Sequence, residues 1–464
     1  MEKAKRAFSW GRWLKGARAF FESTPFMIFE TFVAFLFAAF EQEQMGAFFF
    51  VSLMAIQLMV CEDILVTTLP FLLVATFATR GSLDFLNTFK NVLIIAPPAI
   101  AAFIFHFVVY HKPIYGGESG FGLGLVSVAV TLGGVGRYAI GEYLHWAYYV
   151  IGLGVGMFLA YFLMKSQFSV RFAYDVRKRF SKIMLFSGIY CAALVGYGYI
   201  RKLTGLPMGV YQRTWVSPNN VATMLMFSMP FPMYLAREKF KKWLIIFTPL
   251  FYTAIIATVS RGGILMGGVE FAVITLVWLR GGKWDRKKTV ICIVGGVAML
   301  GVVIACWDTI VVRFFETDWT KGARFKMIKQ AYYAFKDGPL FGTGILDTSL
   351  EFEENRAEGM LCWYHMMIPQ VVGSMGLIGI AAYGRQILDR FRLIFKRMDA
   401  WALCLGVSYL GILLMSQVNP GEFCPVPFCL MSVILFIMQE RRLTEQTLPI
   451  AKSYFTTVRC EALQ

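Results

Sequence analysis

The sequence predicts an all-α protein, a polytopic bundle of transmembrane helices. Of its 464 residues, 57% are hydrophobic and only 16% are charged, and the mean hydropathy is +0.59. Soluble proteins of this length carry far more charge. Apolar segments near the length that crosses a bilayer recur from one end of the chain to the other. No long polar segment separates them, so we expect one membrane domain over residues 1–464.

The apolar segments predict about 12–14 spans. The basic, aromatic segment before Phe20 has no small-residue cleavage site after its first apolar run. We therefore expect it to remain on the protein as a cytoplasmic or interfacial segment. The expected spans lie near residues 24–40, 46–60, 64–79, 92–110, 120–137, 145–164, 183–200, 217–236, 243–259, 262–279, 289–306, 366–388, 401–418 and 424–438.

Lys and Arg are concentrated in short connectors between the apolar segments. Most of the 45 basic residues lie in six stretches: 3–18, 165–182, 237–242, 280–288, 385–397 and the tail from 441. Basic connectors remain on the cytoplasmic side of a membrane, so we expect a multi-pass protein of the cytoplasmic membrane with both termini inside. The net charge of +16 is thus a signal of topology and of attraction to anionic lipid. We expect the lipid bilayer as a partner and no nucleic acid.

One connector, residues 307–365, is long and polar. It holds seven Lys or Arg and nine Asp or Glu residues, and the alternation of the spans places it on the extracytoplasmic side. Within it the spacing predicts an amphipathic helix that either lies on the membrane surface or packs over the bundle. Its apolar face carries Phe325, Ile328, Tyr332 and Phe335, and its basic face carries Arg324, Lys326, Lys329 and Lys336.

Arg261 is a basic residue on the outer side, where the rule that basic connectors stay in the cytoplasm does not explain it. It lies between Ser260 and Gly262 in a short break between two apolar segments, on the outer side. A charged residue beside a membrane span is costly and is usually functional. The two glycines that follow Arg261 would let a phosphate approach the backbone. The alternative is an arginine that caps a tight turn and extends its side chain to the interface.

Arg213 is expected at a similar depth. It precedes Ser217-Pro218-Asn219-Asn220, a pattern that predicts the start of a helix on the outer side. Two guanidinium groups at one depth suit a diphosphate, because each binds phosphate bidentately and stays charged.

His365 ends the long connector and begins the next span. Histidine accepts a proton near neutral pH, so this residue is the candidate base. Acidic clusters at Glu41 with Glu43, and at 351–354, are the candidates for metal binding. Neither has a histidine close by in sequence, and we expect no metal site.

Four segments together resemble the O-antigen ligase and O-antigen polymerase family, over residues 213–379. Each is short, and their order and outward placement carry the resemblance. One departure is Met366, because the family usually has asparagine directly after its histidine. The segments are Arg213-Thr214-Trp215-Val216-Ser217-Pro218-Asn219, Ser260-Arg261-Gly262-Gly263, the run from Arg324 to Ile328 ending in Gly338-Pro339-Leu340-Phe341-Gly342-Thr343-Gly344, and His365 followed by Gly373, Gly376 and Gly379.

The resemblance implies a metal-independent glycosyltransferase without a cofactor. Members transfer a glycan from undecaprenyl diphosphate to an acceptor hydroxyl on a glycan or glycolipid, as a ligase or as a polymerase. His365 is then expected to be catalytic. Three arginines are expected to bind the diphosphate, and three residues to support them: Arg213, Arg261 and Arg324, and Asn219, Ser260 and Gly262.

Two other classes of function fit the composition. A flippase or transporter of lipid-linked oligosaccharide would also need an arginine-lined cavity, and Glu270, nine residues into the span after Arg261, suits proton coupling. A non-catalytic component that works with other polysaccharide-assembly proteins is the third class. The long outer connector has no counterpart in the first half of the chain, which disfavours transporters built from inverted repeats.

Overall fold

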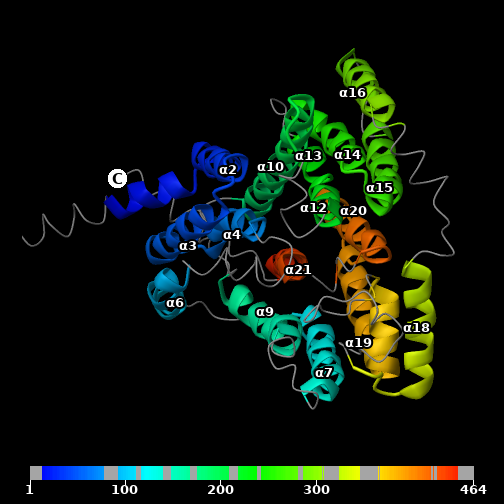
Figure 1. The fold of residues 1–464 in the computed structure, drawn as a ribbon. Coiled ribbons are helices and arrows are strands. Elements are labelled where there is room, and N and C mark those ends of the chain that lie inside the picture. The colour runs from blue at the N-terminus through cyan, green and yellow to red at the C-terminus, as the bar shows by residue number, and fades with distance from the viewer. Residues whose placement is uncertain are drawn as a thin grey trace, which may run out of the picture.

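The structure is a computed structural model of the 464-residue chain, shown in Figure 1. All structural statements concern the described residues, which are 13–77, 92–110, 117–138, 148–167, 175–207, 218–237, 242–280, 286–305, 307, 323–344, 364, 366–419, 422 and 426–447.

The described residues form helices and no strands, which confirms the predicted all-α class. In chain order the elements are α2 (Thr24–Ala39), α3 (Glu43–Val60), η1 (Ile64–Thr67), α4 (Thr68–Ala75), α6 (Val92–Val109), α7 (Ser119–Tyr138), η2 (Tyr148–Val155), α9 (Gly156–Gln167), α10 (Val176–Leu203), α12 (Pro218–Ser228), α13 (Phe231–Leu235), η4 (Lys242–Ile246), α14 (Phe247–Ala257), α15 (Arg261–Arg280), α16 (Arg286–Ala305), α18 (Ala323–Asp337), α19 (Met367–Phe395), α20 (Ala400–Ser416) and α21 (Val426–Thr447).

Several of these helices are long and apolar enough to cross a membrane. Five qualify by themselves, and α2 qualifies with the short helix before it, Trp13–Phe21, across a bend of 58°. Five shorter apolar helices accompany them. The five full-length candidates are α3, α6, α10, α15 and α19. The protein is therefore a multi-pass membrane protein built as a helical bundle, and the total of about 12–14 spans stays a prediction.

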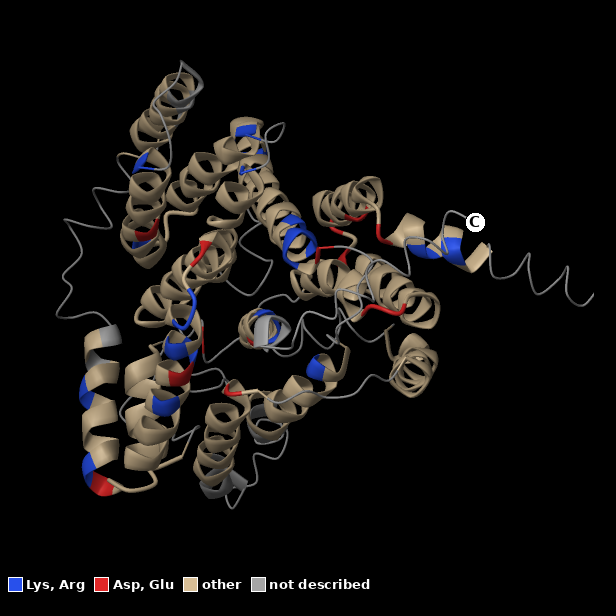
Figure 2. Ribbon diagram, turned by 180° about the vertical axis from the view of Figure 1, so that it is seen from behind, with Lys and Arg blue, Asp and Glu red and all other residues tan. Residues whose placement is uncertain are grey.

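The outer surface of the bundle is apolar, as contact with lipid requires. The α6 helix is a clear example. Only 11% of its 18 residues are buried, and Leu93, Ile94 and Val108 are among the exposed ones. Figure 2 shows that acidic and basic residues occupy little of the helical ribbon.

Two predicted spans differ in the structure, one of them because proline removes a backbone donor. The span expected at 217–236 consists of α12 and α13, which part at Met229 and Pro230. The span expected at 424–438 is longer than predicted, since α21 continues to Thr447.

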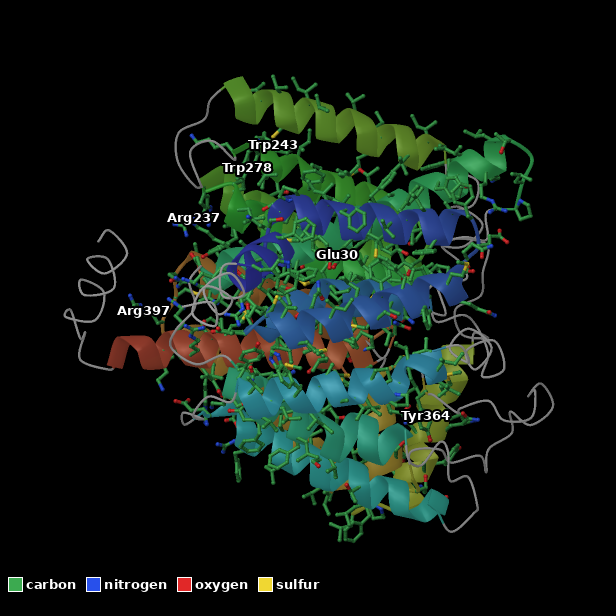
Figure 3. The ribbon with its side chains drawn as sticks, turned by 90° about the vertical axis from the view of Figure 1, so that its left-hand side faces the viewer. Glu30, Arg237, Trp243, Trp278, Tyr364 and Arg397 are labelled. Atoms are coloured by element: carbon green, nitrogen blue, oxygen red, sulfur yellow. The ribbon has the colours of Figure 1, made fainter. Side chains whose placement is uncertain are left out.

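The two ends of the bundle differ in sequence. In Figure 3, Arg237 and Arg397 lie at one end and Tyr364 lies at the other. We call these the basic end and the Tyr364 end. The predicted placement of basic connectors opposite the long connector stays a prediction.

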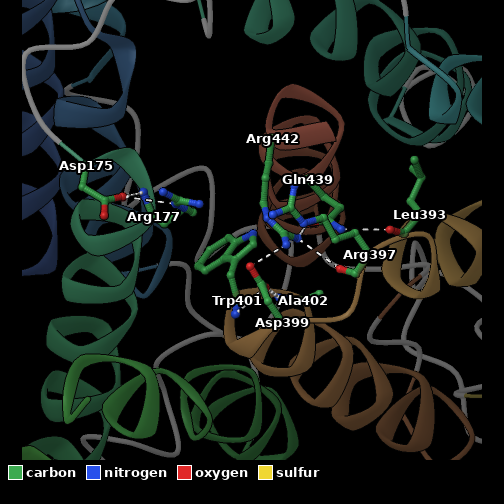
Figure 4. A network of polar contacts seen from close by, with 9 residues as sticks. All are labelled: Asp175, Arg177, Leu393, Arg397, Asp399, Trp401, Ala402, Gln439 and Arg442. Atoms are coloured by element: carbon green, nitrogen blue, oxygen red, sulfur yellow. Dashed lines mark hydrogen bonds and ion pairs between the residues drawn. The ribbon is translucent and has the colours of Figure 1, made fainter. Parts of the chain in front are cut away.

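Polar contacts at the basic end connect the last three helices (Figure 4). Asp399 caps α20, because its carboxylate accepts the Trp401 and Ala402 N–H groups at 2.9 Å. The buried Arg442 of α21 pairs with the same carboxylate. Gln439 donates to the Leu393 carbonyl at 2.8 Å, which joins α21 to α19.

Helix α19 is broken at Gly376, which has φ 59° and ψ −148°. In a regular helix, the N–H groups of residues 377 and 378 would donate to the carbonyls of 373 and 374. Here residues 339–344 replace those partners. The bonds run from Leu377 N to Pro339 O (2.9 Å), Ile378 N to Leu340 O (3.2 Å), Thr343 N to Gly373 O (3.0 Å) and Gly344 N to Ser374 O (3.2 Å).

We call this contact between residues 339–344 and 373–378 the glycine clasp. A Cβ on Gly376 would lie 2.6 Å from Pro339 O, and one on Gly342 would lie 2.2 Å from the Ser374 carbonyl carbon. The two backbones therefore approach each other at a distance that only glycine permits. The segment that follows the amphipathic helix thus splits α19.

Helix α18 is the predicted amphipathic helix. Ala331 and Ala334 are buried, and a Cβ on Gly373 of α19 would lie 3.1 Å from the Ala331 Cα. Phe325 and Tyr332, by contrast, are 56% and 57% exposed. The alanine face thus packs over the bundle, and the aromatic face does not. In Figure 1, α21 is seen end-on and α18 is seen from the side, so the two helices are roughly perpendicular. This orientation suits a helix that lies in the plane of a membrane.

Candidate functional site

The turn between α14 and α15 has a strained backbone. Val259 has φ 55°, a left-handed conformation that is unusual for a β-branched residue and costs on the order of 1–3 kcal/mol. Thr258 Oγ1 accepts the Ser260 N–H at 3.3 Å and donates to the Ile255 carbonyl at 2.7 Å. Such outliers cluster at functional sites, so the turn is a candidate site on its backbone geometry alone.

Ser260 caps α15 and also connects it to α12. Its Oγ accepts the Gly263 N–H at 3.2 Å, as an N-cap residue does. The same hydroxyl donates to Asn219 Oδ1 at 2.7 Å. Asn219 lies in the first turn of α12, so the two helices begin side by side. The structure thus brings together two of the predicted supporting residues.

Arg261 is the first residue of α15 and is partly exposed. A positive charge at a helix N-terminus opposes the helix dipole, and an anion bound there would relieve the repulsion. Trp278, near the other end of α15, lies toward the basic end in Figure 3. Since α15 is continuous, Arg261 is about 25 Å away along the axis, at the Tyr364 end.

The two glycines after Arg261 are explained by packing. A Cβ on Gly262 would lie 2.3 Å from Val418 Cγ2, and one on Gly263 would lie 2.8 Å from the Ala222 Cβ. Protein atoms therefore fill the space that we expected to be open to a phosphate. Gly262 supports the turn because it admits Val418.

The residues on both sides of His365 are fixed by α19. The Tyr364 N–H donates to Gln370 Oε1 at 3.1 Å, and Gln370 Nε2 donates to Ser374 Oγ at 2.8 Å. The Tyr364 ring also packs close to Gly373. Met366, which follows, is the N-cap residue of α19. Tyr364 and Met366 are thus anchored to the part of α19 that the glycine clasp contacts.

Three of the predicted site side chains cannot be placed. His365 and Arg213 lie outside the described residues, and Arg324 is described only as the second residue of α18, without its side chain. In the part of the chain that is described, no group of three or more His, Cys, Asp or Glu residues could hold a metal ion.

Residues 244–384 match the family model described as O-antigen ligase. Over these residues the chain is similar to the O-antigen ligase family. The matched region contains Arg261 with its strained turn, α18, the glycine clasp and His365. No curated protein matches the chain.

Part of the candidate site lies outside the region that matches the O-antigen ligase model. Asn219 comes before it, and Val418 and Asn419 come after it. Asn419 Nδ2 donates to Asn220 Oδ1 at 2.8 Å, and both side chains are buried. Our sequence reasoning missed Asn220, Val418 and Asn419. The Asn419-Pro420-Gly421 sequence marks a turn, but nothing in it indicates a contact with residue 220.

Proposed function

We propose that the protein transfers a glycan from undecaprenyl diphosphate to an acceptor hydroxyl at the outer face of the cytoplasmic membrane. The observation that carries the proposal is Arg261, placed on a strained, capped helix start at the Tyr364 end. It lies within the region that matches the O-antigen ligase family. A membrane enzyme of this family acts on lipid-linked glycans and glycan acceptors.

The proposed donor site uses arginine for charge compensation. The guanidinium of Arg261, with those of Arg213 and Arg324, binds the diphosphate and stabilises the negative charge that grows on it as it leaves. These cations take the part that a metal ion has in other glycosyltransferases. We therefore propose a metal-independent, C-type glycosyltransferase without a cofactor.

The reaction is a single displacement at the anomeric carbon. The acceptor oxygen forms a bond to that carbon, and the bond from the carbon to the diphosphate oxygen breaks. The leaving lipid diphosphate keeps the electron pair, and His365 accepts the proton of the hydroxyl. The apolar exterior of the bundle suits a donor whose polyprenyl chain stays in the bilayer. The acceptor is a glycan or a glycolipid, and ligation and polymerisation use the same step.

The proposed orientation has the basic end in the cytoplasm and residues 307–365 outside, and it also assigns both chain termini to the cytoplasm. A cysteine introduced at Asp347 should then react with a membrane-impermeant maleimide in intact cells, and one at Lys288 should react only after the membrane is opened. Labelling at position 288 with none at 347 would reverse the orientation.

A transfer assay in detergent tests the function. Purified protein mixed with undecaprenyl-diphosphate-linked glycan and an acceptor should form the joined product without added metal or nucleotide sugar. A flippase, the alternative function, would yield no product there, because detergent micelles have no separate compartments. Absence of product together with lipid translocation in vesicles would therefore replace the transferase proposal with the flippase.

A further inference from the structure

We infer that the turn between α20 and α21 positions Arg261, and that a buried ion pair between Arg390 and Glu422 fixes this turn. The inference rests on the proposed function, because the positioned residue is the proposed diphosphate ligand. We use the name α20–α21 turn for the described residues 416–419 and 422 alone.

The α20–α21 turn contacts both helix starts of the candidate site. Val418 lies against Gly262, where even a Cβ would be 2.3 Å from its Cγ2. Asn419 donates to Asn220, the residue after Asn219. Since Asn219 accepts from Ser260, the starts of α12 and α15 and the α20–α21 turn form one connected unit beside Arg261.

The other end of the turn is fixed inside the bundle by Glu422. Its N–H donates to Ser416 Oγ at 2.7 Å, and its carbonyl accepts from the Cys429 thiol at 3.1 Å. Its carboxylate accepts from Ser432 Oγ at 3.1 Å and pairs with Arg390. Backbone and side chain of this one residue are therefore bonded to α19, α20 and α21.

Arg390 is as well held as its partner. Its guanidinium donates to Tyr409 OH at 3.2 Å and lies over the Tyr409 and Phe436 rings, 5.2 and 5.0 Å from their centroids. The side chains of Arg390 and Glu422 are only 2% and 3% exposed. A buried pair with additional hydrogen bonds has one geometry, and removal of one partner leaves an uncompensated charge.

Such a pair is a poor source of stability, because well-packed apolar residues of similar volume often stabilise a protein as much. Its contribution here is the position that it imposes on Glu422. The residues of the turn that reach the site, Val418 and Asn419, lie within four positions of that anchor. The ion pair thus sets where the turn meets Gly262 and Asn220, and through them the direction of Arg261.

Asn419→Ala tests the inference, with Gln417→Ala as the matched control. Gln417 lies in the same turn, but its side chain donates to Leu413 O of its own helix at 3.1 Å. We expect Asn419→Ala to lower kcat/KM for the lipid-linked donor by roughly 10- to 100-fold, as a misplaced binding group does. The thermal unfolding midpoint of each variant should stay above the assay temperature, so that both are measured in the folded state.

Hydrogen exchange of the full-length protein gives a readout that does not depend on activity. The amides of residues 259–264 should exchange roughly fivefold faster in Asn419→Ala, because a buried hydrogen bond that holds the turn is lost. Gln417→Ala should leave them unchanged. Unchanged exchange in Asn419→Ala would overturn the inference whether or not the wild-type protein transfers glycan.

The double variant separates coupling from general damage. If Asn220 and Asn419 act as a unit, Asn220→Ala together with Asn419→Ala should lose no more kcat/KM than the more severe single variant. Additive losses would show two independent effects and would contradict a positioning contact. Failure of the proposed function would appear separately, as absence of transfer by the wild-type protein.

Discussion

His365→Ala should slow glycan transfer by on the order of 10²- to 10⁴-fold and leave donor binding intact. The residue is expected to take the proton of the acceptor hydroxyl, and it has no part in binding the diphosphate. The flanking backbone should not move, because Tyr364 is held by Gln370 and Met366 caps α19. The measurements are the initial rate of transfer and the affinity for undecaprenyl-diphosphate-linked glycan.

Arg213→Ala is the comparison for His365→Ala. It should lose donor affinity as well as rate, since it removes a proposed phosphate ligand. A base that must be deprotonated should also give an acidic limb in the pH profile of kcat, which His365→Ala removes. If His365→Ala lost donor affinity and Arg213→Ala kept it, the two roles would have to be exchanged.

Arg261→Ala should reduce kcat/KM by on the order of 10²- to 10³-fold, the effect of removing one group that stabilises developing charge. Arg261→Lys should also be strongly impaired, because lysine keeps the charge but cannot bind two phosphate oxygens as a fork. Arg280→Ala, at the other end of the same helix, is the control and should transfer at the normal rate.

Stability distinguishes this role of Arg261 from a structural one. A cation at a helix N-terminus is unfavourable, so Arg261→Ala should remain folded, and its thermal unfolding midpoint checks this. A variant that transfers glycan at a near-normal rate, or that loses activity because it no longer folds, would remove the basis for the diphosphate role.

Local sequence patterns predicted much of the fold. Hydropathy predicted membrane helices, and the Ser217-Pro218-Asn219-Asn220 pattern predicted the start of α12. The pattern of α18 predicted an amphipathic helix, but not which face would pack. Ala331 and Ala334 bury their face because they allow close approach to Gly373, a property of the partner helix that periodicity along α18 cannot show.

The contacts that Val418 and Asn419 make with the site could not be predicted, for a related reason. Asn419 and Asn220 are separated by 199 positions, and no local pattern connects them. The reason for Gly262 was likewise hidden: a glycine beside an arginine suits an open phosphate site, whereas its neighbour here is Val418.

The glycine clasp has a consequence for the order in which the protein is made. Residues 339–344 leave the ribosome before residues 373–378, and the carbonyl and N–H groups that they bond do not exist until the start of α19 has been synthesised. The clasp bonds of the segment after α18 therefore cannot form while the next thirty or so residues are added. Closure of the clasp is then a late event of membrane insertion, and it fixes α18 only once α19 has entered the bilayer.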